Sequence, residues 1–100
     1  MITVLQTQSS APYIFDVTVE DDAGRTRHQV TMDQAMYQRL TGGRIPPARC
    51  IEETFAFLLE RETKEALLPN FDLIFVSAFF PEFISEFKNR LASARPADPP

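Results

Sequence analysis

Cys50 and His28 are the residues whose types could form a nucleophilic pair. A cysteine attacks as its thiolate, and the helix dipole lowers a thiol pKa in the first turn of a helix, where we expect Cys50 to lie. Such catalysis also needs a base within hydrogen-bonding reach of the thiol. Free cysteine more often behaves as a small buried hydrophobic residue, and His28 falls on an apolar strand face. We therefore predict no catalytic residue, and an enzyme that uses this pair is the third of three hypotheses.

Carboxylates are the other side chains that could do chemistry, as ligands of a hard cation. A structural zinc site takes four nitrogen or sulfur ligands, which one cysteine and one histidine cannot supply. Four glutamates of the second half lack the spacing of a calcium loop and are typical of a solvated helix face: Glu52, Glu53, Glu60 and Glu62. Gly42-Gly43-Arg44 lacks the flanking strand and the Gly-Lys-Ser/Thr ending of a phosphate loop. We expect neither a metal nor a cofactor.

Two alternating runs between residues 13 and 31 predict the element that would position His28. Phe15, Val17 and Val19 share one face of the first run, which indicates a half-buried strand. The second run follows a short Asp/Gly turn at residues 21–24, so the two runs predict a β-hairpin. If the apolar residues of both runs share one face, the parity of the register sets His28 opposite Val17.

Helical periodicity after the hairpin predicts three or four helices, at about 33–41, 47–62, 71–79 and 81–91. Thr31 and Gln34 have the spacing of a capping box, with Asp33 as the alternative N-cap, and Glu60 and Lys64 have that of an i, i+4 ion pair. Residues 71–79 are ambiguous because a short apolar run also suits a strand; we favour a helix. The N-terminus and residues 71–77 are the candidates for a third strand.

These elements predict a single α+β domain at residues 1–91, followed by a disordered Pro-rich tail at 92–100. The net charge of −4 and a single cysteine exclude a basic protein and an internal disulfide. The first twelve residues lack the basic start and apolar run of a signal peptide, and no stretch reaches the length of a membrane span. We expect a cytoplasmic protein that does not contact a membrane.

Several segments resemble a family of short, uncharacterised bacterial proteins. They are FDVTV at 15–19, HQVT at 28–31, YQRLTGG at 37–43, FAFLLERE at 55–62, FDL at 71–73 and FFPEF at 79–83. The resemblance covers most of the chain except its two ends. It implies a small bacterial cytoplasmic protein, and it implies no chemistry because the family has no established activity.

Phenylalanine is the compositional exception, with nine copies, no tryptophan, and eight of the nine from Phe55 onward. Six rings between residues 71 and 87 cannot all face one side of a helix, and exposed aromatic clusters mark partner or self-association surfaces. The candidate interaction surface is Phe57, Phe79, Phe80, Phe83 and Phe87. The leading hypothesis is a non-enzymatic interaction or regulatory module that binds a protein partner or a second copy of itself, and no nucleic acid.

The second hypothesis is a dimeric DNA-binding regulator. The order strand, helix, helix over residues 25–62 is that of ribbon-helix-helix proteins, whose paired strands enter the major groove. On the strand, Arg25, Arg27 and Gln29 face outward, and these side chains suit guanine and adenine edges. The acidic net charge does not favour it, because affinity for the phosphate backbone comes from lysine and arginine.

Overall fold

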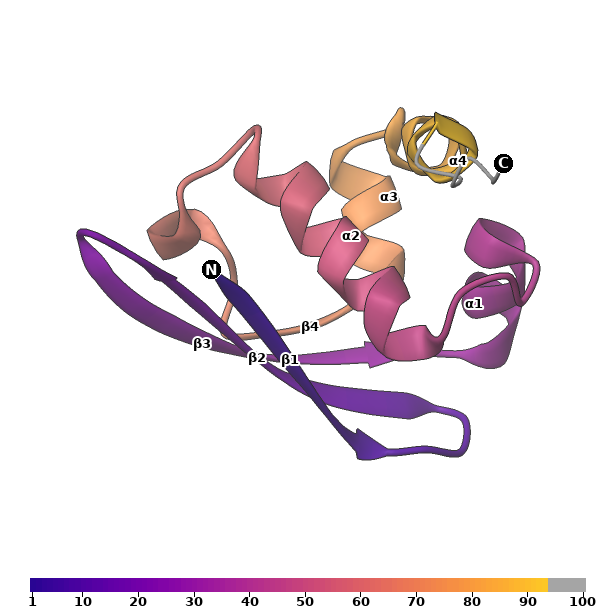
Figure 1. Ribbon diagram of the computed structural model, residues 1–100, viewed down its shortest axis with the longest axis horizontal. Coiled ribbons are helices and arrows are strands. Elements are labelled where there is room, and N and C mark those ends of the chain that lie inside the picture. The colour runs from indigo at the N-terminus through magenta and orange to yellow at the C-terminus, as the bar shows by residue number, and fades with distance from the viewer. Residues whose placement is uncertain (94–100) are drawn as a thin grey trace, which may run out of the picture.

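A four-stranded sheet forms one layer of the protein in the computed structural model, which describes residues 1–93 (Figure 1). The strands are β1 (Ile2–Gln8), β2 (Tyr13–Asp21), β3 (Gly24–Met32) and β4 (Asn70–Asp72), in that order across the sheet. Neighbouring strands are antiparallel except for β3 and β4, which are parallel. The sheet is therefore larger than the two-stranded hairpin expected from the sequence, because both candidate regions for a third strand contribute one.

The register of β2 and β3 decides which side chains face the helices. Val17 lies opposite His28 and Phe15 opposite Val30, which is the pairing that the parity of the alternation requires. Asp21 pairs with Gly24 across the turn, and Gly24 has a φ of 135°, a conformation that glycine adopts without strain. Phe15, Val17 and Val19 of β2 and His28, Val30 and Met32 of β3 are buried on the inward face.

Four helices pack on one side of the sheet (Figure 1), so the α+β class is confirmed. They are α1 (Gln34–Thr41), α2 (Pro47–Leu59), α3 (Ile74–Phe79) and α4 (Phe83–Ser93), with a 3₁₀ turn η1 (Lys64–Ala66). The region 71–79 divides into β4 and α3, because residues 70–72 pair with β3 before the chain turns into a helix. None of the described helices is long and apolar enough to cross a membrane.

The ends of α1 and α2 differ in detail from the sequence prediction. Asp33 caps α1, since its Oδ1 accepts the backbone N–H of Met36 at 2.7 Å. The capping box was wrong: the Thr31 hydroxyl donates to Asp72 instead, and the Gln34 side chain accepts from Tyr13. Helix α2 ends at Leu59 rather than at residue 62.

The core lies between the sheet and α2, and α4 completes it. Phe57, Phe83 and Phe87 are all almost completely buried and form a chain of ring contacts, with centroids 5.0 Å and 5.9 Å apart. These three residues therefore belong to the core and not to an exposed surface, which corrects the candidate set drawn from the sequence. The burial of each ring removes apolar area from water, the main favourable contribution to folding.

Helix α4 runs to Ser93, two residues beyond the predicted end of the domain at residue 91. Ala92 and Ser93, which were assigned to the tail, are therefore helical. The rest of the predicted tail, residues 94–100, lies outside the described residues.

Candidate functional site

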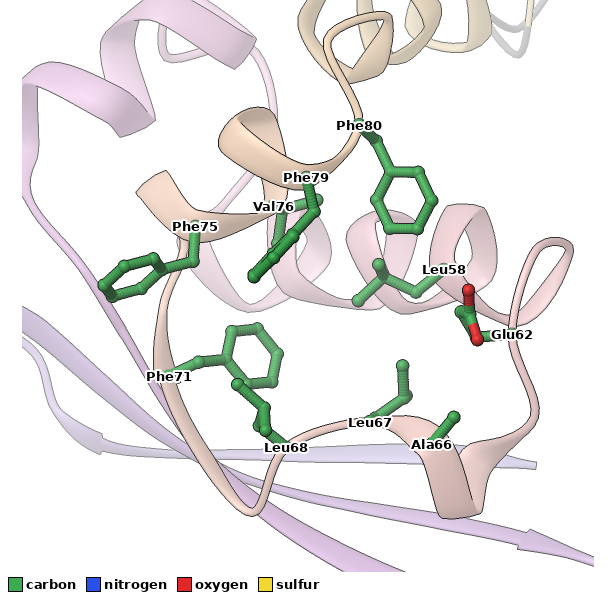
Figure 2. A pocket seen from close by; sticks show the side chains of 10 residues that line it. All are labelled: Leu58, Glu62, Ala66, Leu67, Leu68, Phe71, Phe75, Val76, Phe79 and Phe80. Atoms are coloured by element: carbon green, nitrogen blue, oxygen red, sulfur yellow. The ribbon is translucent and has the colours of Figure 1, made fainter.

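An apolar pocket of about 420 Å³ opens between α3 and the segment that begins at the last residue of η1 (Figure 2). One wall is formed by Phe75 and Phe79 of α3, and the other by residues 66–68, which we call the lower wall. Leu58 of α2 lies behind them. Ten residues line the pocket: Leu58, Glu62, Ala66, Leu67, Leu68, Phe71, Phe75, Val76, Phe79 and Phe80.

Three large apolar side chains around this pocket are exposed to solvent. Phe79 is 70% exposed, Phe75 51% and Leu68 52%. Phe75 and Phe79 lie four residues apart, and this spacing places them on the same face of α3, while Val76 faces the core and is buried. The helix therefore holds two aromatic rings at the rim of the pocket instead of burying them.

Lys64 ties the lower wall to the tip of the hairpin. Its side chain is almost fully buried, and its Nζ donates to Asp21 Oδ1 at 2.7 Å and to Glu65 Oε2 at 2.6 Å. The hydrogen bonds from Lys64 hold the pKa values of Asp21 and Glu65 below their ordinary values, and those bonds raise the pKa of Lys64. The predicted pair of Lys64 with Glu60 was wrong, since Glu60 pairs with Arg61 and Arg90.

His28 fixes the other end of the lower wall. Its Nδ1 lies 2.8 Å from the backbone oxygen of Leu68, and its Nε2 lies 2.9 Å from the Thr26 hydroxyl. Because a carbonyl oxygen only accepts, Nδ1 must carry a proton and donate it to Leu68. The backbone N–H of Gln29 also donates to the oxygen of Pro69 at 2.7 Å. Strand β3 thus positions the wall that Leu68 presents to the pocket.

Asp72 fixes the start of α3. One of its carboxylate oxygens accepts from the Thr31 hydroxyl at 2.6 Å, and the other accepts the backbone N–H of Ile74 at 3.0 Å. On the far side, Phe80 packs edge-on against Phe57, with centroids 5.8 Å apart. Both walls are therefore anchored to the sheet or the core, so the pocket is a formed feature of the fold.

Glu62 is the one charged residue among those that line the pocket. Its exposed side chain makes no ion pair or hydrogen bond with any of residues 1–93. The nearest cations along the chain are already engaged: Arg61 contacts Glu60 and Glu82, and Lys64 contacts Asp21 and Glu65. The pocket thus combines apolar walls with a single uncompensated carboxylate.

The structure does not join Cys50 and His28 into a nucleophilic pair. Cys50 is fully buried, and its Sγ lies 3.7 Å from the sulfur of Met32. Burial, and secondarily the charge of Glu53, raises the pKa of the Cys50 thiol to about 12. Both ring nitrogens of His28 have other partners, as described above. The expected lowering of the thiol pKa by the helix dipole was therefore wrong, because loss of hydration outweighs the dipole.

Arg25, Arg27 and Gln29 lie exposed on the face of the sheet that the helices leave open. Arg25 forms a 3.3 Å ion pair with Glu20, whose strand neighbours its own. Arg27 and Gln29 border a second, more polar hollow of about 580 Å³ on this face, together with Asp16 and Thr18. Both edges of β3 between Gln29 and Thr31 are already paired, with β2 on one side and β4 on the other.

Sequence reasoning found part of this site and missed part of it. Phe79 and Phe80 were in the candidate set, and both line the pocket. Leu68, Phe75 and Glu62 were not in that set. One feature of the sequence could have indicated Leu68. Two leucines stand directly before Pro69, and a proline ends a helix, so these leucines cannot belong to the apolar face of a helix that continues past them. Within residues 1–93, no three His, Cys, Asp or Glu side chains are grouped so as to hold a metal ion.

Comparison of the chain with protein-family models, with curated proteins and with solved structures finds no match in any of the three. The function is therefore argued from the geometry of the pocket.

Proposed function

We propose that this protein is a non-enzymatic interaction module that binds a partner protein through the apolar pocket between α3 and the lower wall. The observation that carries the proposal is the concentration of exposed apolar side chains there. Of the six large hydrophobic residues that are exposed within residues 1–93, four lie between Leu68 and Phe79. Soluble proteins rarely expose large contiguous apolar patches unless the patch binds something.

The shape of the surface supports the same proposal. Its volume lies within the range of ligand-binding pockets, about 300–1,000 Å³. The walls are anchored by Lys64, His28 and Asp72, so a partner would not have to order them on binding. Preorganised surfaces bind more tightly because less conformational entropy is lost.

Affinity capture from native lysate, with nuclease present, tests the proposal with matched variants. Phe75→Ser and Phe79→Ser remove exposed rings from the pocket rim, and Leu5→Ser removes an exposed side chain that is 62% accessible on the open sheet face. We expect a stoichiometric partner that is retained by the wild type and by Leu5→Ser and lost with both pocket variants. Equal capture by all four proteins would overturn the proposal, provided that circular dichroism shows all four to be folded.

The DNA-binding hypothesis has less support from the geometry. In a ribbon-helix-helix dimer the strand pairs with its copy, whereas β3 is already paired on both sides between Gln29 and Thr31. The capture experiment without nuclease also tests this hypothesis. Nucleic acid that co-elutes with the wild type and is lost with Arg27→Ala would favour it over the pocket.

A further inference from the structure

We infer that the pocket binds a basic amphipathic segment of the partner protein, with apolar side chains between the two walls and a lysine or arginine beside Glu62. This inference rests on the proposed function and names the chemistry of its partner. Three features carry it: the uncompensated charge, the layout of the walls, and the exposed area that extends beyond the pocket.

The charge of the pocket selects against an acidic or second-copy occupant. Glu62 is the pocket's one charged residue, and no cation within residues 1–93 pairs with it. An apolar ligand that covered this carboxylate without pairing it would desolvate a charge at considerable cost. A lysine or arginine of the ligand, paired with the carboxylate, offsets this loss of hydration. A second copy bound symmetrically would bring its own Glu62 to the same region, and the chain carries a net charge of −4.

The layout of the walls suits a segment of polypeptide. Figure 2 shows Phe75 and Phe79 on one side and Leu67 and Leu68 on the other, with Glu62 at one end. A groove of this kind accepts side chains spaced at i and i+3 or i+4 from one face of a helix. The carboxylate at the end of the groove then orients the segment, because the basic residue must lie at that end.

The apolar area that is exposed outside the pocket favours a polypeptide over a small amphiphilic molecule as the ligand. Ile74 is 52% exposed and lies outside the pocket lining, next to Phe75 in the chain, and Phe79 projects at the rim. A small molecule that filled the pocket would leave the outer surface of these side chains in water. A peptide segment that crosses the rim covers the pocket and its border together, which removes more apolar area from water.

Selection of a random sixteen-residue peptide display library on the wild-type protein, with counter-selection on Phe79→Ser, tests the inference. We expect enriched peptides to combine Leu, Ile or Phe at i and i+3 or i+4 with a Lys or Arg at one end. Enriched peptides that are acidic or uncharged would overturn the inference and leave the proposed function standing. Failure to enrich any Phe79-dependent peptide would overturn the inference. If the wild-type protein also captured no lysate partner whose binding depends on Phe75 and Phe79, the proposed function would be overturned as well.

Fluorescence anisotropy with one enriched peptide locates the charge contact. Glu62→Gln should weaken binding about threefold and Glu62→Lys about tenfold or more, as for a partly exposed ion pair. Glu52→Gln is the matched control, because Glu52 lies on α2 beside Arg49 and outside the pocket lining, and it should leave the affinity unchanged. Equal affinities for the wild type and both Glu62 variants would contradict the assigned contact. Thermal melting confirms that each variant is folded.

Discussion

Single side chains hold the lower wall of the pocket against the sheet, and Lys64 is the most buried of the charged ones. Its ammonium lies inside the protein, whereas the side chains of Asp21 and Glu65 remain more than half exposed. The two carboxylates offset the loss of hydration that burial imposes on the ammonium. Lys64 can therefore stay charged while it holds its end of the lower wall to Asp21 at the hairpin tip.

We expect the Lys64 contacts to give the stability of the protein a marked dependence on acidic pH. The pKa values of Asp21 and Glu65 are lowered in the folded state, so their stabilisation is present above their ordinary pKa, about 4, and is lost as the pH falls through the folded values. The Lys64 pKa is raised, so its contribution is complete below about pH 10 and is lost as the pH rises through the folded value.

The measurement is urea unfolding of the wild type and Lys64→Met at several pH values between 5 and 2. The unfolding free energy of the wild type should fall more steeply over this range than that of the variant, because the variant lacks the group that lowers both carboxyl pKa values. Lys88→Met, a change at the exposed second lysine, should keep the wild-type slope. Identical slopes for all three proteins would show that Lys64 does not act on these carboxylates.

Cys50 should be chemically inert in the folded protein. It is fully buried, and its thiol pKa is raised to about 12, so almost no thiolate is present at pH 8. Labelling then requires opening of the structure. For a protein of ordinary stability, the rate with Ellman's reagent should be at least about 10³-fold lower than in 6 M urea. Comparable rates in buffer and in urea would contradict the observed burial.

At the scale of elements, α1 depends on one cap. Asp33 accepts the N–H of Met36, whereas Gln34, the partner expected in the capping box, bonds Tyr13 at the surface. Asp33→Ala should therefore lower the free energy of unfolding by about 1 kcal/mol. Asp33→Asn should lower it by much less, because an asparagine side chain can also cap the helix. Urea unfolding measures both. If Gln34→Ala cost as much as Asp33→Ala, the capping box would be in use after all.

Strand β4 and helix α3 show how short elements gain stability from long-range contacts. Strand β4 has only three residues, and α3 has six, too few for either to form alone in water. The pairing of Val30 with Phe71 and the bond from Thr31 to Asp72 join them to β3 across about forty residues of chain. Such contacts decide that Phe75 and Phe79 stand at the rim of a pocket.

At the scale of the whole molecule, the phenylalanines divide into two groups with different consequences. Phe57 is fully buried, with the Arg61 guanidinium 3.8 Å above its ring, whereas Phe79 is mostly exposed. Phe57→Ala should cost about 3–5 kcal/mol of stability because it leaves a core cavity. Phe79→Ala should change it by no more than about 0.5 kcal/mol. Urea unfolding compares them, and similar costs would mean that Phe79 is also a core residue.

Much of the fold could be predicted from local sequence patterns. Alternation in residues 13–31 indicated strands with Val17 and His28 on the inner face, and helical periodicity indicated a helix at about 33–41, which agrees with α1. Strand β1 was harder to predict from the sequence, because four of its seven residues are Gln or Thr and obscure the alternation of Ile2 and Val4. The site was indicated only as an excess of phenylalanine near the C-terminal end.

The sequence by itself determined the class of the protein, the hairpin and the approximate helices, because these follow from periodicities within a few neighbouring residues. Only the tertiary structure decided that Phe57, Phe83 and Phe87 are core while Phe75 and Phe79 are surface. It also decided that Lys64 bonds Asp21 and that His28 bonds Leu68. Each of these facts depends on residues far apart in the chain, and local periodicity contains no information about which distant faces meet.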